Sequence, residues 1–203
     1  LNLLNECKKI KLKKFVYAAS ASCYGNPKNI PTSENSKINN LTPYAYTKWK
    51  AEQLIMKKSR QQKFSAISLR FFNVYGPRSA ATSSYSSVIS IFLKLKKNNK
   101  PLMIFGDGKQ TRDFVHVSDV VNALIKSGES KTCNGIFNVG CQTSVDINKV
   151  AKIFDSKINY LPHRKGEPEA SKANIAKIKK KLKWKPKISI KKGIKLLIKN
   201  SRD

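Results

Sequence analysis

The stretch FVYAASASCYG, residues 15–25, gives the clearest indication of how this chain folds. Its first part, from Phe15 to Ala19, is a short and nearly continuous apolar run, which is typical of a strand buried in a parallel sheet. The run ends in small and hydroxylated residues that begin at Ser20. In open parallel sheets the ligand crevice lies beyond the carboxyl ends of the strands, so chemistry is expected at Ser20.

A second informative stretch, LTPYAYTKWK, covers residues 41–50. Thr42 and Pro43 are typical of a helix start, and the helix that follows places Tyr44 and Lys48 four residues apart on one face. A phenol has an ordinary pKa of about 10, and a cation beside it favours the phenolate that a general base requires. Taken alone, such a pair also occurs by chance in any lysine-rich helix.

The rest of the chain alternates between apolar runs of strand length and segments of helical periodicity, and this pattern predicts an α/β fold with a parallel sheet. We expect strands over 15–20, 64–70, 102–105 and 136–140, and helices from Leu1, from Thr42, over 86–97, after a Ser118–Asp119 cap, over 145–154, around 175–182 and around 190–198.

Polar residues follow the second of these strands in the segment LRFFNVYGPR, residues 69–78. A buried Arg70 and Asn73 would each need hydrogen-bonding partners. For an isolated pair of this spacing, a satisfied structural role is the better interpretation.

The net charge of +29 raises the question of nucleic-acid binding. Only six of the 41 basic residues are arginine, and the lysines are spread along the whole chain. Proteins that recognise a nucleic-acid sequence rely heavily on the planar guanidinium group of arginine. We therefore expect solvated lysine faces, weak and salt-sensitive binding to polyanions, and no specific nucleic-acid partner.

The four cysteines show no CxxC pairing and no histidine at metal-ligand spacing, so neither a metal site nor a disulfide framework is expected. Reduced thiols fit a cytoplasmic protein. No apolar run approaches the ~20 residues needed to span a bilayer, and no charged-then-apolar leader is present.

Five motifs in register resemble one family over nearly the whole chain. They are Ser20 four residues before Tyr24-Gly25, Tyr44-x-x-x-Lys48, the segment 69–77, Gly106-Asp107-Gly108 through Arg112-Asp113-Phe114, and Arg164-x-Gly166-Glu167. The set resembles the extended short-chain dehydrogenase/reductase family, and within it the nucleotide-sugar epimerases for UDP-glucose and UDP-N-acetylglucosamine. The resemblance implies a Rossmann-like sheet and a smaller carboxyl-terminal α/β part that binds substrate.

For the reacting end of the site, the resemblance implies a role for each residue. Tyr44 would take the proton from the sugar 4-hydroxyl while hydride leaves C4 for NAD, and the 4-keto sugar would take hydride back on its other face. Ser20 would hydrogen-bond the same oxygen, and Lys48 would hold the nicotinamide ribose. Phe71 and Phe72 would lie near the nicotinamide.

For the substrate, the resemblance places Asn73, Arg112 and Arg164 at the nucleotide diphosphate, where arginine offers forked hydrogen bonds to phosphate oxygens. Phe105 would form a wall for the base. Ser171 would stand where a bulky side chain can narrow the sugar pocket, so a 2-acetamido group would fit and UDP-N-acetylglucosamine is as suitable as UDP-glucose.

One local contrast separates epimerases from related enzymes. Sugar-nucleotide 4,6-dehydratases carry an acidic pair just before the Tyr-Gly segment, and UDP-glucuronate decarboxylases usually have a glutamate there. This chain has Ala21 and Ser22 at that place. The contrast favours 4-epimerisation, which needs only the serine, the tyrosine and the lysine.

The family binds NAD through a glycine-rich turn, and none of the nine glycines forms one in this chain. By resemblance, the first strands of the sheet and the pyrophosphate loop lie upstream of Leu1. Residues 1–78 would then be the last part of the NAD-binding domain, and 79–203 mainly the substrate-binding region, with some segments returning to the sheet. Two interpretations remain open: an epimerase that is a homodimer when intact, and a portion without activity of its own. A basic nucleic-acid-binding protein is a third and less favoured interpretation.

Overall fold

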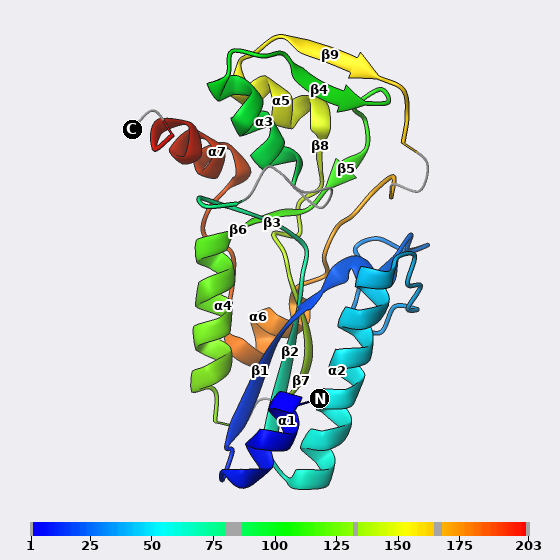
Figure 1. Cartoon of the computed structure of the whole chain (residues 1–203), viewed down its shortest axis with the longest axis vertical. Coiled ribbons are helices and arrows are strands. Elements are labelled where there is room, and N and C mark those ends of the chain that lie inside the picture. Colours follow the sequence, from blue (N-terminus) through cyan, green and yellow to red (C-terminus); the bar gives the residue numbers. More distant parts are fainter. Residues whose placement is uncertain (1, 80–86, 132–133, 165–167, 202–203) are drawn as a thin grey trace.

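The computed structural model describes residues 2–79, 87–131, 134–164 and 168–201. The lower part of the molecule in Figure 1 is a parallel sheet between helices, and the upper part is a smaller group of helices and short strands. The expected α/β class is confirmed.

Three parallel strands form the main sheet, in the order β1 (Lys14–Ser20), β2 (Ser65–Phe71) and β7 (Gly135–Val139). The apolar runs predicted as strands over 15–20, 64–70 and 136–140 are therefore strands, with ends that differ by one residue at most. Because the strands are parallel, their carboxyl ends meet at one edge of the sheet.

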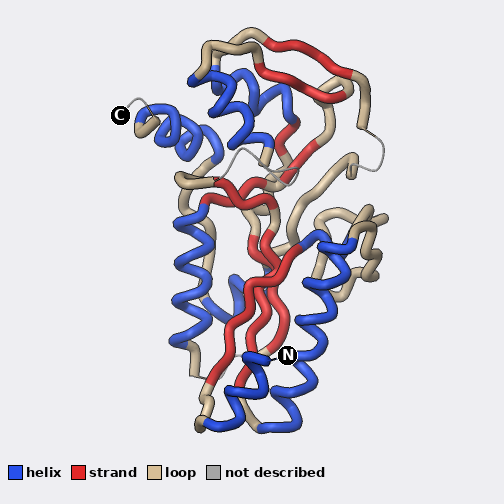
Figure 2. The backbone as a smooth tube through the Cα atoms, in the orientation of Figure 1, coloured by secondary structure: helices blue, strands red, loops and turns tan. Residues whose placement is uncertain are grey.

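The central strand β2 alternates its side chains between two helical layers. Ala66, Ser68 and Arg70 face the long helix α2 (Pro43–Gln62), to which Glu52 and Ile55 belong. Ile67 and Leu69 face the opposite layer, formed by α4 (Val117–Glu129) and α6 (Ala176–Leu182). Figure 2 shows the strands running between α2 and α4.

A second core holds the upper part together. It is built from α3 (Val88–Lys97), α5 (Ile147–Phe154), α7 (Ile190–Lys199) and a parallel pair, β4 (Leu102–Phe105) with β9 (Ile158–Leu161). Phe92 and Phe154 meet edge to face at its centre, with ring centroids 5.7 Å apart. The predicted strand over 102–105 and the predicted helices over 86–97 and in the tail are present, although Ser86 lies outside the described residues. The helix predicted over 145–154 begins only at Ile147, because Asp146 caps it and residues 145–146 form a short strand.

The start of α4 differs from the prediction. The expected Ser118–Asp119 cap is wrong, because the helix begins at Val117 and the ring nitrogen Nδ1 of His116 accepts the backbone N–H of Ser118 at 3.2 Å. The Asp119 carboxylate instead accepts the amides of Lys187 and Ile188, both at 3.0 Å. Asp119 therefore fixes the carboxyl-terminal segment to the fold.

Several short elements were not predicted, because so few residues carry little periodicity. They are the 3₁₀ turns η1 (Cys7–Lys9) and η2 (Ala21–Tyr24), and the strands β3 (Asn73–Tyr75), β5 (Thr111–Arg112), β6 (Phe114–His116), β8 (Val145–Asp146) and β9. The predicted opening helix is present as α1 (Asn2–Glu6), which has only five residues, and Leu1 lies outside the described residues.

Asp113 lies between β5 and β6 and joins three segments. Its carboxylate is completely buried and accepts the amides of Cys141 at 2.6 Å, Gln142 at 2.9 Å and Ala173 at 2.9 Å. Burial raises the pKa of this carboxyl to about 6, although the three amide donors act in the opposite direction. The residue therefore holds β7 and the segment after Pro168 together.

Replacing Asp113 with asparagine is expected to lower the free energy of unfolding by about 2–4 kcal/mol, because the new NH₂ group would face an amide N–H. Urea denaturation measures the loss. Asp155→Asn is the matched control: Asp155 is exposed with a left-handed backbone that asparagine accepts, so a change below about 0.5 kcal/mol is expected there. Equal denaturation midpoints for wild type and both variants would contradict this role.

Candidate active site

Ser20 ends β1 and caps the turn η2. Its hydroxyl oxygen accepts the backbone N–H of Ser22 at 3.2 Å and the Ser22 hydroxyl at 2.9 Å. The turn closes at Gly25, whose φ of +58° suits glycine and where a Cβ would collide with the carbonyl oxygen of Asn39. The local sequence thus holds the Ser20 hydroxyl at the carboxyl edge of the sheet.

The helix α2 presents Tyr44 and Lys48 beside this edge. Thr42 caps the helix by accepting the N–H of Ala45 at 3.1 Å, and Tyr44, which is 43% exposed, lies in the first turn. The Lys48 ammonium lies 6.0 Å from the ring centroid of Tyr44 and donates to the carbonyl oxygen of Ala18 at 3.1 Å. The predicted sharing of one helical face is therefore present.

A cavity of about 420 Å³ lies at the same edge. Seven of the predicted site residues line it together: Ser20, Tyr44, Phe71, Phe72, Asn73, Arg112 and Ser171. Lys48 is not among the lining residues. Sequence reasoning missed further polar lining residues, Ser22, Thr32 and Thr42, because hydroxyl side chains are too common for their positions to stand out.

Asn73 and Ser171 form one wall of this cavity. The Asn73 amide donates to the carbonyl oxygen of Asp113 at 3.1 Å and to the Ser171 hydroxyl at 3.2 Å. That hydroxyl also accepts the Asp113 N–H at 3.2 Å. Both side chains are therefore held in place by the fold.

A smaller hollow of about 310 Å³ adjoins the cavity, and Pro168 lines both. It contains the two remaining predicted substrate residues, Phe105 and Arg164, and the Arg164 guanidinium stacks 3.8 Å from the Phe105 ring centroid. Gln110 also lines it and donates to the Phe105 carbonyl at 2.9 Å. The Gly166-Glu167 part of the fifth motif lies outside the described residues.

A buried polar network lies beneath the cavity. The Arg70 guanidinium contacts both carboxylate oxygens of Glu52, at 2.6 and 3.0 Å, and the Tyr24 hydroxyl at 2.8 Å. Tyr24 donates in turn to the Asn138 side chain at 2.7 Å, and burial raises the pKa of this phenol, so it stays a donor. Arg70 thus has the structural role predicted for it, with Glu52 as a partner that sequence reasoning missed.

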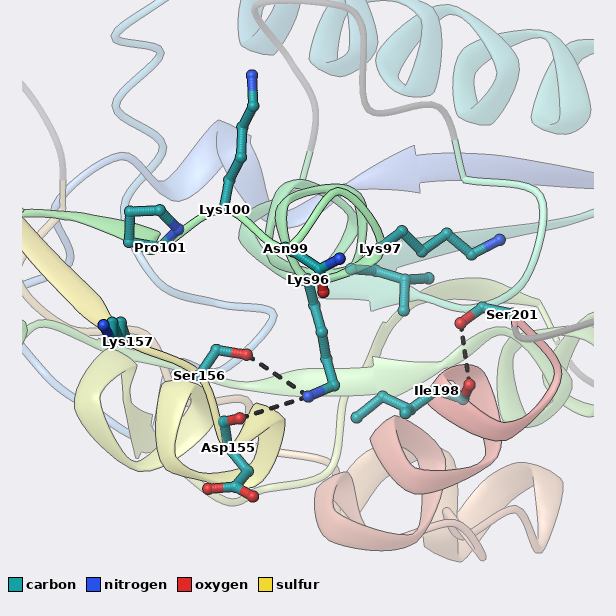
Figure 3. A pocket seen from close by; sticks show the side chains of 11 residues that line it. Lys96, Lys97, Asn99, Lys100, Pro101, Asp155, Ser156, Lys157, Ile198 and Ser201 are labelled. Carbon is teal, nitrogen blue, oxygen red and sulfur yellow. Dashed lines mark hydrogen bonds between the residues drawn. The ribbon is translucent and has the colours of Figure 1, made fainter.

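Another cavity, of about 650 Å³, lies where α3, α5 and α7 end (Figure 3). Four of its eleven lining residues are lysines, and the Lys96 ammonium donates to the carbonyl oxygen of Phe154 at 2.6 Å. A cation at helix carboxyl ends is an ordinary stabilising feature. Because none of the predicted site residues lines this cavity, we do not regard it as the reactive site.

Within the described ranges, no three histidine, cysteine or acidic side chains gather as metal ligands. The same part of the chain contains no helix that is long and apolar enough to cross a membrane. Cys7, Cys23 and Cys141 are free thiols, and Cys133 lies outside the described residues.

Comparisons with known proteins agree with this geometry. The chain is 37% identical over 206 residues to a putative UDP-glucose 4-epimerase of Methanocaldococcus jannaschii, a match that covers 98% of this chain and 66% of that protein. It is 31% identical to UDP-glucuronic acid decarboxylase 4 of Arabidopsis thaliana, covering 100% of this chain and 47% of that protein. The chain thus spans about half to two thirds of these relatives.

Among solved structures, the UDP-glucose 4-epimerase of Thermotoga maritima with UDP-glucose superimposes with a TM-score of 0.92 at 32% identity, covering 98% of this chain and 67% of that one. The family model for the NAD dependent epimerase/dehydratase family matches residues 1–140. The Rossmann-like fold and the family expected from the motifs are confirmed: the chain belongs to the NAD dependent epimerase/dehydratase family.

Proposed function

We propose that this chain binds a nucleoside-diphosphate sugar along its two adjoining hollows and serves the epimerisation of that sugar at C4. The observation that carries the proposal is the meeting of Ser20 and Tyr44, from separate segments, in one cavity that also contains Arg112. UDP-glucose and UDP-N-acetylglucosamine are the substrates we favour.

At the reacting end, Tyr44 in its phenolate form would take the proton from the sugar 4-hydroxyl, with the Ser20 hydroxyl hydrogen-bonded to the same oxygen. The side chain must therefore be a phenolate before the transfer, and it becomes a neutral phenol when it accepts the proton. The Lys48 ammonium, 6.0 Å from the ring centroid, carries a positive charge that would stabilise the phenolate electrostatically.

The family cofactor is NAD, which when bound supplies a reversible hydride acceptor at the sugar carbon. Lys48 and Tyr44, with Phe71 and Phe72, are the residues that would hold its nicotinamide-ribose end. Lys48 is suited to this role, because an ammonium has three N–H groups and the Ala18 carbonyl accepts one of them. No glycine-rich turn for the pyrophosphate occurs among the nine glycines of the sequence.

At the nucleotide end, Arg112 and Arg164 would bind the diphosphate together with Asn73, and Phe105 would lie against the base. Ser171, on the cavity wall, is small enough to leave room for a 2-acetamido group. This placement uses both hollows and puts the sugar beside Tyr44.

Replacing Arg112 with alanine is expected to weaken UDP binding about 10–100-fold, because hydrogen bonds to charged groups contribute about 1.5–3 kcal/mol. Calorimetric titration with UDP measures this. Lys109→Ala is the control, since Lys109 lines the smaller hollow but is 84% exposed, and less than about a 3-fold change is expected. Equal affinities for the two variants would count against a phosphate contact at Arg112.

The reaction class is tested by incubating the chain with NAD and, separately, UDP-glucose, UDP-N-acetylglucosamine and UDP-glucuronate. Because Ala21 and Ser22 supply no acid at the place used for elimination or decarboxylation, we expect a 4-epimer of unchanged mass. Mass spectrometry and NMR of the product distinguish the outcomes. Loss of carbon dioxide or water would overturn the epimerase assignment.

A second candidate function is binding of the nucleotide sugar without turnover. The absence of a glycine-rich turn from the sequence favours it. UDP-glucose affinity without epimerisation or NAD binding would support this candidate and exclude autonomous catalysis by the chain.

A further inference from the structure

Glu52 shares a helical face with the two reactive residues of α2. It follows Lys48 by four residues and Tyr44 by eight, so the three side chains lie along one stripe of the helix. Tyr44 is 43% exposed at the cavity, whereas Glu52 is 1% exposed. One end of this stripe, at Tyr44, therefore lies at the cavity, whereas the other end, at Glu52, is charged and buried.

From Glu52 the contacts lead to every element that carries the reacting end of the site. The Glu52 carboxylate accepts hydrogen bonds from the Arg70 guanidinium and from the Ser68 hydroxyl. Both residues belong to β2, and the last residue of that strand, Phe71, lines the cavity. Arg70 continues to the hydroxyl of Tyr24, in the turn that Ser20 caps. One ion pair therefore connects the helix of Tyr44 with the turn of Ser20.

Stability alone is a poor explanation for this arrangement. A buried ion pair gains little over apolar side chains of similar volume, because desolvation offsets the attraction between the charges. A buried network whose members are all hydrogen-bonded does hold its side chains in one arrangement, because any other arrangement would leave buried charges unpaired. Further along α2, after Glu52, the contact with the sheet is apolar: Ile55 belongs to a buried cluster with Phe64 and Ala66.

We infer that Glu52 and Arg70 are positioning residues that set the Tyr44 phenol and the Ser20 hydroxyl at the spacing needed to bind one sugar oxygen. The inference rests on the proposed function and deepens it. Tyr24 transmits the constraint, since it is a lining residue of the cavity and its hydroxyl is hydrogen-bonded to Arg70 and Asn138. The nucleotide end, at Phe105 and Arg164, lies outside this network.

The test is saturation-transfer difference NMR of the chain with UDP-glucose and no NAD, comparing transfer to the glucosyl protons with transfer to the uracil protons. Two variants interrupt the network. Glu52→Met combined with Arg70→Met removes both charges at similar volume, and Tyr24→Phe removes only the linking hydroxyl. The control is Ser59→Ala, which deletes a buried hydroxyl on the same helix that donates to the Phe64 carbonyl at 2.6 Å.

We expect the ratio of saturation transfer, glucosyl to uracil, to fall about 2-fold or more in both network variants. Without the network, the side chains around the sugar would be displaced by about 1 Å and would lose their close contacts with it. The ratio should stay unchanged in Ser59→Ala. A merely structural role would leave the ratio at its wild-type value in every folded variant.

A wild-type ratio in the folded double variant overturns the inference and leaves the proposed function standing. If the double variant does not fold, Tyr24→Phe provides the test, and a wild-type glucosyl-to-uracil ratio in that variant overturns the inference. Wild-type protein that shows no transfer to the glucosyl protons overturns the proposed sugar site, and this inference with it.

Discussion

Replacing Tyr44 with phenylalanine is expected to lower the rate of UDP-glucose epimerisation about 10²–10⁴-fold, the usual contribution of a positioned general base. The variant keeps the ring and its place in the first turn of α2, and loses only the oxygen that would take the proton as a phenolate. UDP-glucose affinity should therefore change by about 5-fold or less, since one lost neutral hydrogen bond is worth about 1 kcal/mol at most sites.

The control for this experiment is Tyr46→Phe. Tyr46 lies two residues further along α2, is 49% exposed and packs against Trp49 with ring centroids 6.2 Å apart, away from the cavity lining. Its variant should turn over at the wild-type rate. Near-normal turnover by Tyr44→Phe, measured by the appearance of the galactosyl anomeric proton, would refute the role given to Tyr44.

Replacing Glu52 with glutamine is expected to lower the free energy of unfolding by about 3–5 kcal/mol, because it leaves the guanidinium of Arg70 buried without a counter-charge. Both partners of this pair are nearly inaccessible, at 3% and 1% side-chain exposure. For a chain of this size the loss corresponds to a fall in melting temperature of about 6–20 °C.

A surface pair supplies the matched control for Glu52. Glu6 and Lys9 are 2.7 Å apart but 63% and 72% exposed, so Glu6→Gln should change the unfolding free energy by less than about 0.5 kcal/mol. Thermal unfolding followed by circular dichroism compares the two variants. A melting temperature for Glu52→Gln that matches that of Glu6→Gln would show that the buried pair is not energetically important.

The long elements were predictable from sequence because each carries its own signal. The apolar runs that became β1, β2 and β7 are long enough to identify alone, and Thr42-Pro43 indicates the start of α2. The grouping of Ser20, Tyr44, Arg112 and Ser171 followed from the order and spacing of motifs. Their meeting in one cavity agrees with that grouping, and their chemical roles stay predictions.

What sequence could not provide depends on contacts between distant residues. Glu52 is the only acidic residue on α2, but nothing in the local sequence shows that it is buried until β2 places Arg70 against it. Asp119 is a second example. An aspartate is a residue type that often caps a helix, but this carboxylate accepts the distant backbone N–H groups of Lys187 and Ile188. The short strands β5 and β8 pair over only two residues, below any periodic signal.

The most direct test of the account is a crystal structure of the chain with UDP-glucose. We predict the uracil beside Phe105, the diphosphate at Arg112, and the sugar 4-oxygen within hydrogen-bonding distance of both the Ser20 and Tyr44 hydroxyls, about 2.6–3.2 Å. Ligand bound elsewhere, for example in the lysine-lined cavity at the ends of α3, α5 and α7, with the cavity at Tyr44 empty, would contradict the account.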